Sequence, residues 1–208
     1  MTADLRKTFD AVFRQLTEDG FLLLSDSFVP SVTTIVTKQK IKGSWWSDPH
    51  ASMIFAVSEM LEDHPDVLIA KLISKKVTFI HRSLWLRIYS IGVARDDWQM
   101  KNLRTEAKKL LKLVDKAGFL ETSKLDRSFG AKPGDTAREL EGRLLLNSRQ
   151  VHTSSGAHAK MLESWEAWAK RLGFNVRAKD SAAAREYLEQ RLASIDKAGR
   201  AKLPWSQK

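Results

Sequence analysis

The chain contains no cysteine, and this absence removes several kinds of chemistry. Disulfide bonds, thiol nucleophiles and cysteine-ligated zinc are all impossible without it. Hydrophobic residues make up 43% and charged residues 29% of the 208, which is typical of one large or two small globular domains. Together these features predict a protein of the reducing cytoplasm.

Long hydrophobic runs are also missing. The longest, such as residues 21–24, fall far short of the roughly 18 residues that a transmembrane helix needs. The N-terminus carries Asp4 and no continuous apolar segment, so we expect no secretory signal. The sequence therefore predicts no membrane partner.

The sequence lacks the short motifs that hold common cofactors. It has no Gly-x-Gly-x-x-Gly loop, no Walker loop and no Gly-x-Ser-x-Gly nucleophile turn. Its histidines do not follow the His-x-x-x-His spacing of zinc-binding helices. We expect neither a cofactor nor a bound metal.

Acidic residues are too few to balance the basic ones. The chain has 35 Lys and Arg against 25 Asp and Glu, which gives a formal charge of +10. Residues 67–95 contain no acid, so the cations are segregated along the chain. Such segregation is typical of a basic face that binds nucleic acid, and we predict DNA as the partner. A small anionic ligand and a merely solvated basic surface are the alternatives.

Apolar spacing predicts a mainly α protein with a small β-hairpin or sheet. We expect strands over residues 67–73 and 77–80, joined by the polar turn 74–76. Residues 31–41 fit either a helix or a strand. The expected helices cover residues 4–18, 49–62, 84–93, 98–116, 136–148, 155–172 and 180–198.

A polar stretch with Gly130, Pro133 and Gly134 is the best candidate for a domain boundary. We therefore expect four regions and see no internal repeat. They are a basic domain over residues 1–122, a linker over 123–135, a helical C-terminal region over 136–198 and a frayed tail over 199–208.

The element order in residues 1–121 resembles that of winged-helix DNA-binding domains, in which a β-hairpin wing follows a group of helices. The resemblance implies a winged-helix-like N-terminal part that binds DNA. This family usually places a recognition helix directly before the wing. Here the helix 49–62 carries Glu59 and Glu62 and no Lys or Arg. We therefore expect the hairpin and the helix after it to contact DNA.

The hairpin carries four candidate cations. Lys71 lies on its first expected strand, Arg82 follows the second strand, and Lys75 and Lys76 lie at its tip. A wing would place the tip against backbone phosphates, which lysine neutralises. The alternative is an ordinary solvated turn.

The helix after the hairpin carries a second group of candidates. Arg104, Lys108 and Lys112 are four residues apart and share a helical face. Like charges at this spacing repel, so the row predicts an anion opposite. That anion is either phosphate or the protein's own acids in residues 139–166.

Lysines and tryptophans meet in the segment before the helix 49–62. Lys38, Lys40 and Lys42 precede the pair Trp45 and Trp46. An indole can stack on an unpaired base, with about 1–3 kcal/mol per base. The alternative is that the indoles belong to the core. Adjacent side chains point in different directions, so we expect one indole inside and one near the surface.

Glu141, His152 and His158 are candidates for acid–base catalysis, with the carboxylate orienting a histidine. Helix capping and packing are the alternative roles. The leading hypothesis is a DNA-binding protein with weak sequence specificity. The second is a nucleic-acid-processing enzyme, a glycosylase or nuclease, and the third is an interaction module for an acidic protein.

Overall fold

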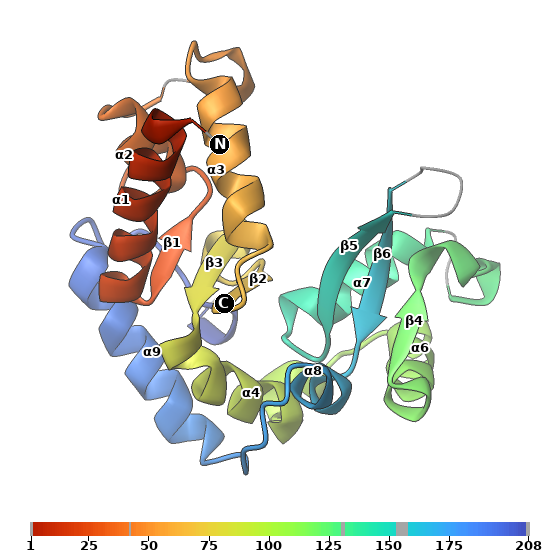
Figure 1. Ribbon diagram of the computed structural model, residues 1–208. Coiled ribbons are helices and arrows are strands. Elements are labelled where there is room, and N and C mark those ends of the chain that lie inside the picture. Colours follow the sequence, from red (N-terminus) through yellow and green to blue (C-terminus); the bar gives the residue numbers. More distant parts are fainter. Residues whose placement is uncertain (1, 42, 130–131, 153–157, 207–208) are drawn as a thin grey trace. The chain divides into compact units, whose positions relative to one another are not determined.

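The computed structural model describes residues 2–41, 43–129, 132–152 and 158–206, except for the side chains of residues 151, 152, 158 and 159. Two compact units divide the chain (Figure 1). The first holds residues 1–85 and 186–207, and the second holds residues 86–185. Most of the described chain is helical, with two three-stranded antiparallel sheets, which confirms the expected mainly α fold class.

The first unit begins with helices and strands in alternation. Its elements are α1 (Ala3–Asp19), β1 (Phe21–Leu23), α2 (Val32–Thr37), α3 (Ala51–Glu62), β2 (Val67–Ala70) and β3 (Thr78–His81). The segment that fits helix or strand by sequence is helical because Ser31 caps it. The Ser31 hydroxyl accepts a hydrogen bond from the Thr34 amide, and the Thr34 hydroxyl accepts one from the Ser31 amide.

The first sheet has the order β1-β3-β2. The expected hairpin is confirmed, because β2 and β3 are antiparallel neighbours, but its first strand ends at Ala70, so Lys71 lies in the connection and not on a strand. A 3-10 turn, η2 (Ile73–Lys75), lies in their connection. The core of this unit packs α1, α2 and α3 against the sheet through buried side chains such as Leu16, Ile54 and Phe79.

The second unit contains the remaining strands and most of the remaining helices. Its elements are α4 (Trp85–Ala94), α5 (Asp97–Met100), α6 (Thr105–Ala117), β4 (Phe119–Glu121), α7 (Pro133–Gly142), β5 (Asn147–His152), β6 (His158–Glu163) and α8 (Trp165–Arg171). The long helix α9 (Ser181–Ile195) crosses the boundary between the units.

Three expected helices differ from the structure. The helix over 98–116 is two helices, because Asn102 adopts a left-handed backbone (φ 57°) between α5 and α6. The helices over 136–148 and 155–172 lose residues to the β5–β6 hairpin. The C-terminal region is therefore not wholly helical.

The expected domain boundaries also differ from the structure. The polar stretch 123–135 lies within the second unit and holds two 3-10 turns, η4 (Thr122–Lys124) and η5 (Arg127–Phe129), and the start of α7. The described part of the tail is packed rather than frayed, because Leu203 is buried and the Lys202 carbonyl accepts a hydrogen bond from the Ser74 amide at 2.7 Å. Its apolar anchor is too short to show a period in the sequence.

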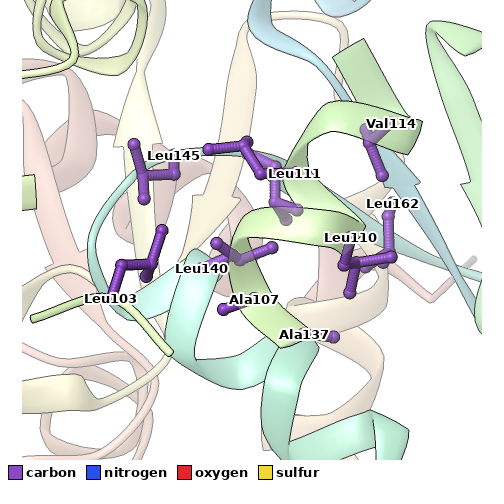
Figure 2. Close-up of a cluster of buried hydrophobic side chains, with 10 residues drawn as sticks. Leu103, Ala107, Leu110, Leu111, Val114, Ala137, Leu140, Leu145 and Leu162 are labelled. Carbon is purple, nitrogen blue, oxygen red and sulfur yellow. The ribbon is translucent and has the colours of Figure 1, made fainter. Parts of the chain in front are cut away.

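Figure 2 shows the apolar core of the second unit. Helix α6 contributes Ala107, Leu110 and Val114, and they pack with Leu140 of α7 and Leu162 of β6. All of these side chains are buried. The opposite face of α6 is thereby left to solvent, and it carries the charged residues.

The two units repeat one arrangement of elements. The second sheet has the order β4-β6-β5, which matches β1-β3-β2 strand for strand. In each unit a helix ends at a glycine of positive φ, Gly20 or Gly118, and Phe-Leu opens the first strand. The repeat lies in topology rather than in sequence, which is why the sequence alone does not reveal it.

The strand registers match as well. In β3, Ile80 lies opposite Phe21 of β1 and Leu68 of β2. In β6, Glu163 lies opposite Phe119 of β4 and the first residue of β5. The residue after each of these positions donates its amide to the carbonyl of the helix-ending glycine, at 3.0 Å in the first unit and 2.9 Å in the second.

No helix in the described part of the chain has both the length and the apolar character needed to cross a bilayer.

Candidate nucleic-acid interface

The cations of the β2–β3 hairpin in the first unit are partly neutralised by acids that lie outside it. Lys76 Nζ lies 2.6 Å from Asp26 Oδ2. Burial acts to raise the pKa of Asp26, but Lys76 and two backbone amides outweigh it, so the pKa lies below the ordinary value. Lys76 is therefore paired with Asp26 and is a poor candidate for binding phosphate.

Of the other three hairpin cations, one is paired with an acid and two are not paired with any described acid. Arg82 Nη1 lies 3.2 Å from Asp66 Oδ1, and its guanidinium lies 5.6 Å from the Trp85 ring. Lys71 and Lys75 are exposed, and neither forms an ion pair with a described carboxylate. Two of the four predicted hairpin contacts are thus available to a partner.

The tryptophan pair forms an exposed aromatic platform. The Trp45 and Trp46 rings stack with centroids 3.8 Å apart, and Trp46 also lies 5.9 Å from Phe55. Trp46 is 61% exposed, whereas Trp45 is half-buried against the core. One indole is therefore partly buried and the other exposed, and both lie in a 3-10 turn, η1 (Trp45–Ser47), in which their rings stack on each other.

Two of the lysines that precede this platform in the sequence line a pocket to which neither tryptophan contributes. Lys38 and Lys40 are exposed and line a pocket with Phe28. Lys42 lies outside the described residues. The sequence proximity of these lysines to the tryptophans therefore does not by itself make one contact surface.

The positive charge of the chain is concentrated in the second unit. Residues 86–185 carry 20 Lys and Arg but 12 Asp and Glu, whereas residues 1–85 and 186–207 together carry 14 and 13. The region expected to be the basic domain is therefore close to neutral over most of its length. A polyanion would be attracted mainly to the second unit.

Helix α6 concentrates this charge on one face. Lys108, Lys109, Lys112 and Lys116 are all exposed. At 3.6 residues per turn they fall within an arc of about 100°, and they span about 12 Å along the axis. This arc lies opposite the buried leucines. We name these four residues the α6 lysine face.

Arg104 does not belong to this face. It lies at the N-cap of α6, outside the helix, and its Nε is 2.5 Å from Glu139 Oε2. The expected row of cations from 104 to 112 is therefore broken, because residues 101–104 separate two helices. Lys109 and Lys116 take its place, and their spacing of three to four residues from Lys112 is the sequence signal for them.

The acids of residues 139–166 are largely paired elsewhere. Glu139 contacts Arg104, Glu141 contacts Lys160 at 2.8 Å, and Glu163 contacts Arg171 at 2.8 Å. Within the described residues, no ion pair joins the α6 lysine face to a carboxylate. The face is therefore not explained by these acids.

Two acids of α6, Glu106 and Asp115, flank the α6 lysine face. Asp115 Oδ1 accepts from Arg95 Nη2 at 2.7 Å. Burial raises the pKa of Asp115 above its ordinary value, and Glu166 adds to this effect, while Arg95 opposes it. Asp115 is engaged by Arg95, and neither it nor Glu106 forms an ion pair with the α6 lysine face in the described part of the chain.

The candidate acid–base group is described only in part. The Glu141 carboxylate, largely buried, holds Lys160 Nζ at 2.8 and 3.0 Å. His152 and His158 are opposite each other at the ends of β5 and β6, but their side chains lie outside the described residues. Among the described residues, no three His, Asp or Glu side chains gather as metal ligands do.

Sequence reasoning missed one group of cations altogether. Lys197 and Arg200 follow α9, yet they lie near Phe28 and Lys40 in the first unit. About 170 residues separate the two segments in the chain. No local pattern could have brought them together, because only the packing of α9 in this unit does so.

Comparison of the chain with protein-family models, curated proteins and solved structures finds no match.

Proposed function

We propose that this protein binds duplex DNA through the α6 lysine face, mainly by neutralising backbone phosphates. The observation that carries this proposal is that four exposed lysines share one helical face without a described carboxylate partner. Like charges at this spacing destabilise an isolated helix by a few tenths of a kcal/mol per pair, roughly. A polyanion opposite them would relieve that repulsion.

We further propose that both units are winged-helix-like modules. In the first unit, the order α1-β1-α2-α3-β2-β3 and the sheet order β1-β3-β2 support this assignment. The second unit supports it with α6-β4-α7-β5-β6 and the same sheet order, where short 3-10 turns replace the second helix. The hairpins β2–β3 and β5–β6 would be the wings.

The helices that precede the two hairpins favour weak sequence specificity. Helix α3 has no Lys or Arg and carries Glu59 and Glu62. In helix α7 the one cation, Arg138, pairs with Asp135. Neither helix offers the unpaired basic side chains that would hold it in the major groove, so affinity would come from phosphate contacts.

The salt dependence of binding tests this proposal. Fluorescence anisotropy with a labelled duplex gives the slope of log K against log salt, and each phosphate contact contributes about −0.9 to it. Lys108→Gln, Lys109→Gln, Lys112→Gln and Lys116→Gln combined should reduce the slope by about 3.6. The fold should persist, because these side chains are exposed.

A matched variant controls for net charge. Lys7, Lys124, Lys170 and Lys179 are exposed lysines on four separate segments, and their joint change to Gln removes the same charge. This control should change the slope of log K against log salt by less than about 0.9, which is the contribution of one phosphate contact. Equal losses in both variants would mean that only net charge matters. A duplex affinity unchanged by salt would refute the proposal. If excess plasmid DNA does not compete with an acidic protein for the chain, the acidic protein is the favoured partner instead.

A further inference from the structure

A shallow, largely open pocket of about 370 Å³ lies in the first unit, where the loop before α2 and the end of α9 come together. Its walls come from the segment 27–40 and from Ile195 and Lys197. The volume is near the lower end of the range for small-molecule sites, about 300–1,000 Å³. All the residues that line the pocket belong to this unit, and none belongs to α6.

Four cations gather at this pocket. Lys38, Lys40 and Lys197 line it, and Arg200 lies against Phe28, which also lines it. All four cations are exposed, and none forms an ion pair with a carboxylate in the part of the chain that the structure describes. No carboxylate lines the pocket. The cluster is therefore a concentration of positive charge without an internal counter-ion.

Two of these cations contact the same aromatic ring. Phe28 is 45% exposed, and its ring centroid lies 5.0 Å from Lys40 Nζ and 4.4 Å from the Arg200 guanidinium carbon. Each such contact contributes about 0.5–1 kcal/mol at an exposed site. The nearby Asp26 cannot neutralise the cluster, because it holds Lys76 and accepts the Phe28 amide.

Lys38 stands in a backbone conformation that favours glycine. It is the C-cap residue of α2, with φ 58° and ψ 15°. A side chain in this left-handed region is strained, so glycine or asparagine is the usual choice there. A lysine at this position adds charge to the pocket at a cost to the backbone.

We propose that this pocket binds the phosphate group of a nucleotide, with the base lying against Phe28 and Arg200. Phosphate is the anion that several converging Lys and Arg side chains hold best. An aromatic ring and a guanidinium plane are the surfaces on which bases stack. The proposal does not depend on the α6 lysine face. The competing explanation is that the cations only complement the C-terminal ends of α2 and α9.

Titration calorimetry at low ionic strength tests the site with adenosine 5′-monophosphate, adenosine and inorganic phosphate. The monophosphate should bind saturably at one site per chain, and adenosine should bind at least about tenfold more weakly, since it lacks the charged group. Lys38→Gly and Lys197→Gln should each weaken monophosphate binding by about tenfold. Lys202→Gln, an exposed lysine of the same unit outside the lining, should leave it unchanged.

Lys38→Gly separates the role of the charge from the fold. Glycine suits φ 58°, so this variant should be folded and no less stable than the parent while it loses affinity. A merely structural lysine would give the parent's affinity. Saturable binding that survives both Lys38→Gly and Lys197→Gln would overturn the proposal, and so would no saturable binding of the monophosphate.

A single-stranded oligonucleotide with a terminal phosphate identifies the source of the nucleotide. If it displaces the monophosphate at lower concentration, the natural ligand is a polynucleotide. If the monophosphate binds more tightly, the ligand is a free nucleotide. Either result requires the pocket. The variant without the α6 lysine face should keep monophosphate binding, so this proposal and the DNA-binding proposal fail independently.

Discussion

Substitution of Gly92 by alanine sets two physical effects against each other. Gly92 lies in α4, where alanine would favour the helix by about 1 kcal/mol if space were open. A Cβ at this position would lie 2.3 Å from Trp165 Nε1 and 2.4 Å from its Cδ1. Ordinary contacts are about 3.5–4.0 Å, so the indole must move.

Trp165 has little freedom to move. It is 1% exposed, its Nε1 donates to the Leu144 carbonyl at 2.8 Å, and its ring packs edge-on against Trp168. Overpacking of this kind costs about 1–3 kcal/mol, and a strained hydrogen bond adds about 1 kcal/mol. After the helical gain is subtracted, Gly92→Ala should destabilise the protein by about 2 kcal/mol.

Thermal unfolding followed by circular dichroism measures this difference. A loss of about 2 kcal/mol should lower Tm by about 4–8 °C in a chain of this length. Gly142→Ala in α7 is the matched control, because a Cβ there meets no atom within 4 Å and should leave Tm equal or higher. A Tm for Gly92→Ala that equals or exceeds the parent's would show that the Trp165 contact does not constrain this position.

Three further outcomes are expected. Arg171→Met should lower the free energy of unfolding by about 2 kcal/mol in urea denaturation, since it leaves the largely buried Glu163 carboxylate without its two hydrogen bonds; an unchanged midpoint would contradict this. Lys76→Met should destabilise the protein at neutral pH and progressively less as the pH falls below 3.8. The reason is that a carboxylate with a lowered folded pKa, here Asp26, stabilises only while it is ionised; an equal loss at every pH would refute the role of the pair. Trp46→Ala should change Tm by less than about 2 °C, as for an exposed side chain, and should reduce the affinity for single-stranded more than for duplex DNA if the indole stacks on bases.

The sequence predicts those parts of the fold that depend on local pattern. The helix that ends at Gly20 and the β2–β3 hairpin follow from apolar spacing and turn residues, and both are present. The break between α5 and α6 is not predictable in this way, because Asn102 interrupts an apolar period that continues on either side. Strand β6 is likewise hidden, since its pairing with β4 joins residues about 40 positions apart.

In the candidate site too, local spacing predicts some features, and others depend on residues far apart in the chain. Lysines three and four residues apart on α6 could be placed on one face from spacing alone. Whether each cation is free depends on tertiary pairing, and Lys76 with Asp26, 50 residues away, shows that spacing cannot decide it. The pocket around Phe28 depends entirely on residues that follow α9.

The first unit is made from both ends of the chain. Arg191 donates to the Asp19 carbonyl, and the amide of Ser74 donates to the Lys202 carbonyl. During synthesis, about 120 further residues must be added after the N-terminal part before these bonds can form. At typical bacterial and eukaryotic rates this takes about 6–24 s. Arg191 and Lys202 follow the second unit in the chain, so the first unit completes its fold only after the whole second unit has been synthesised.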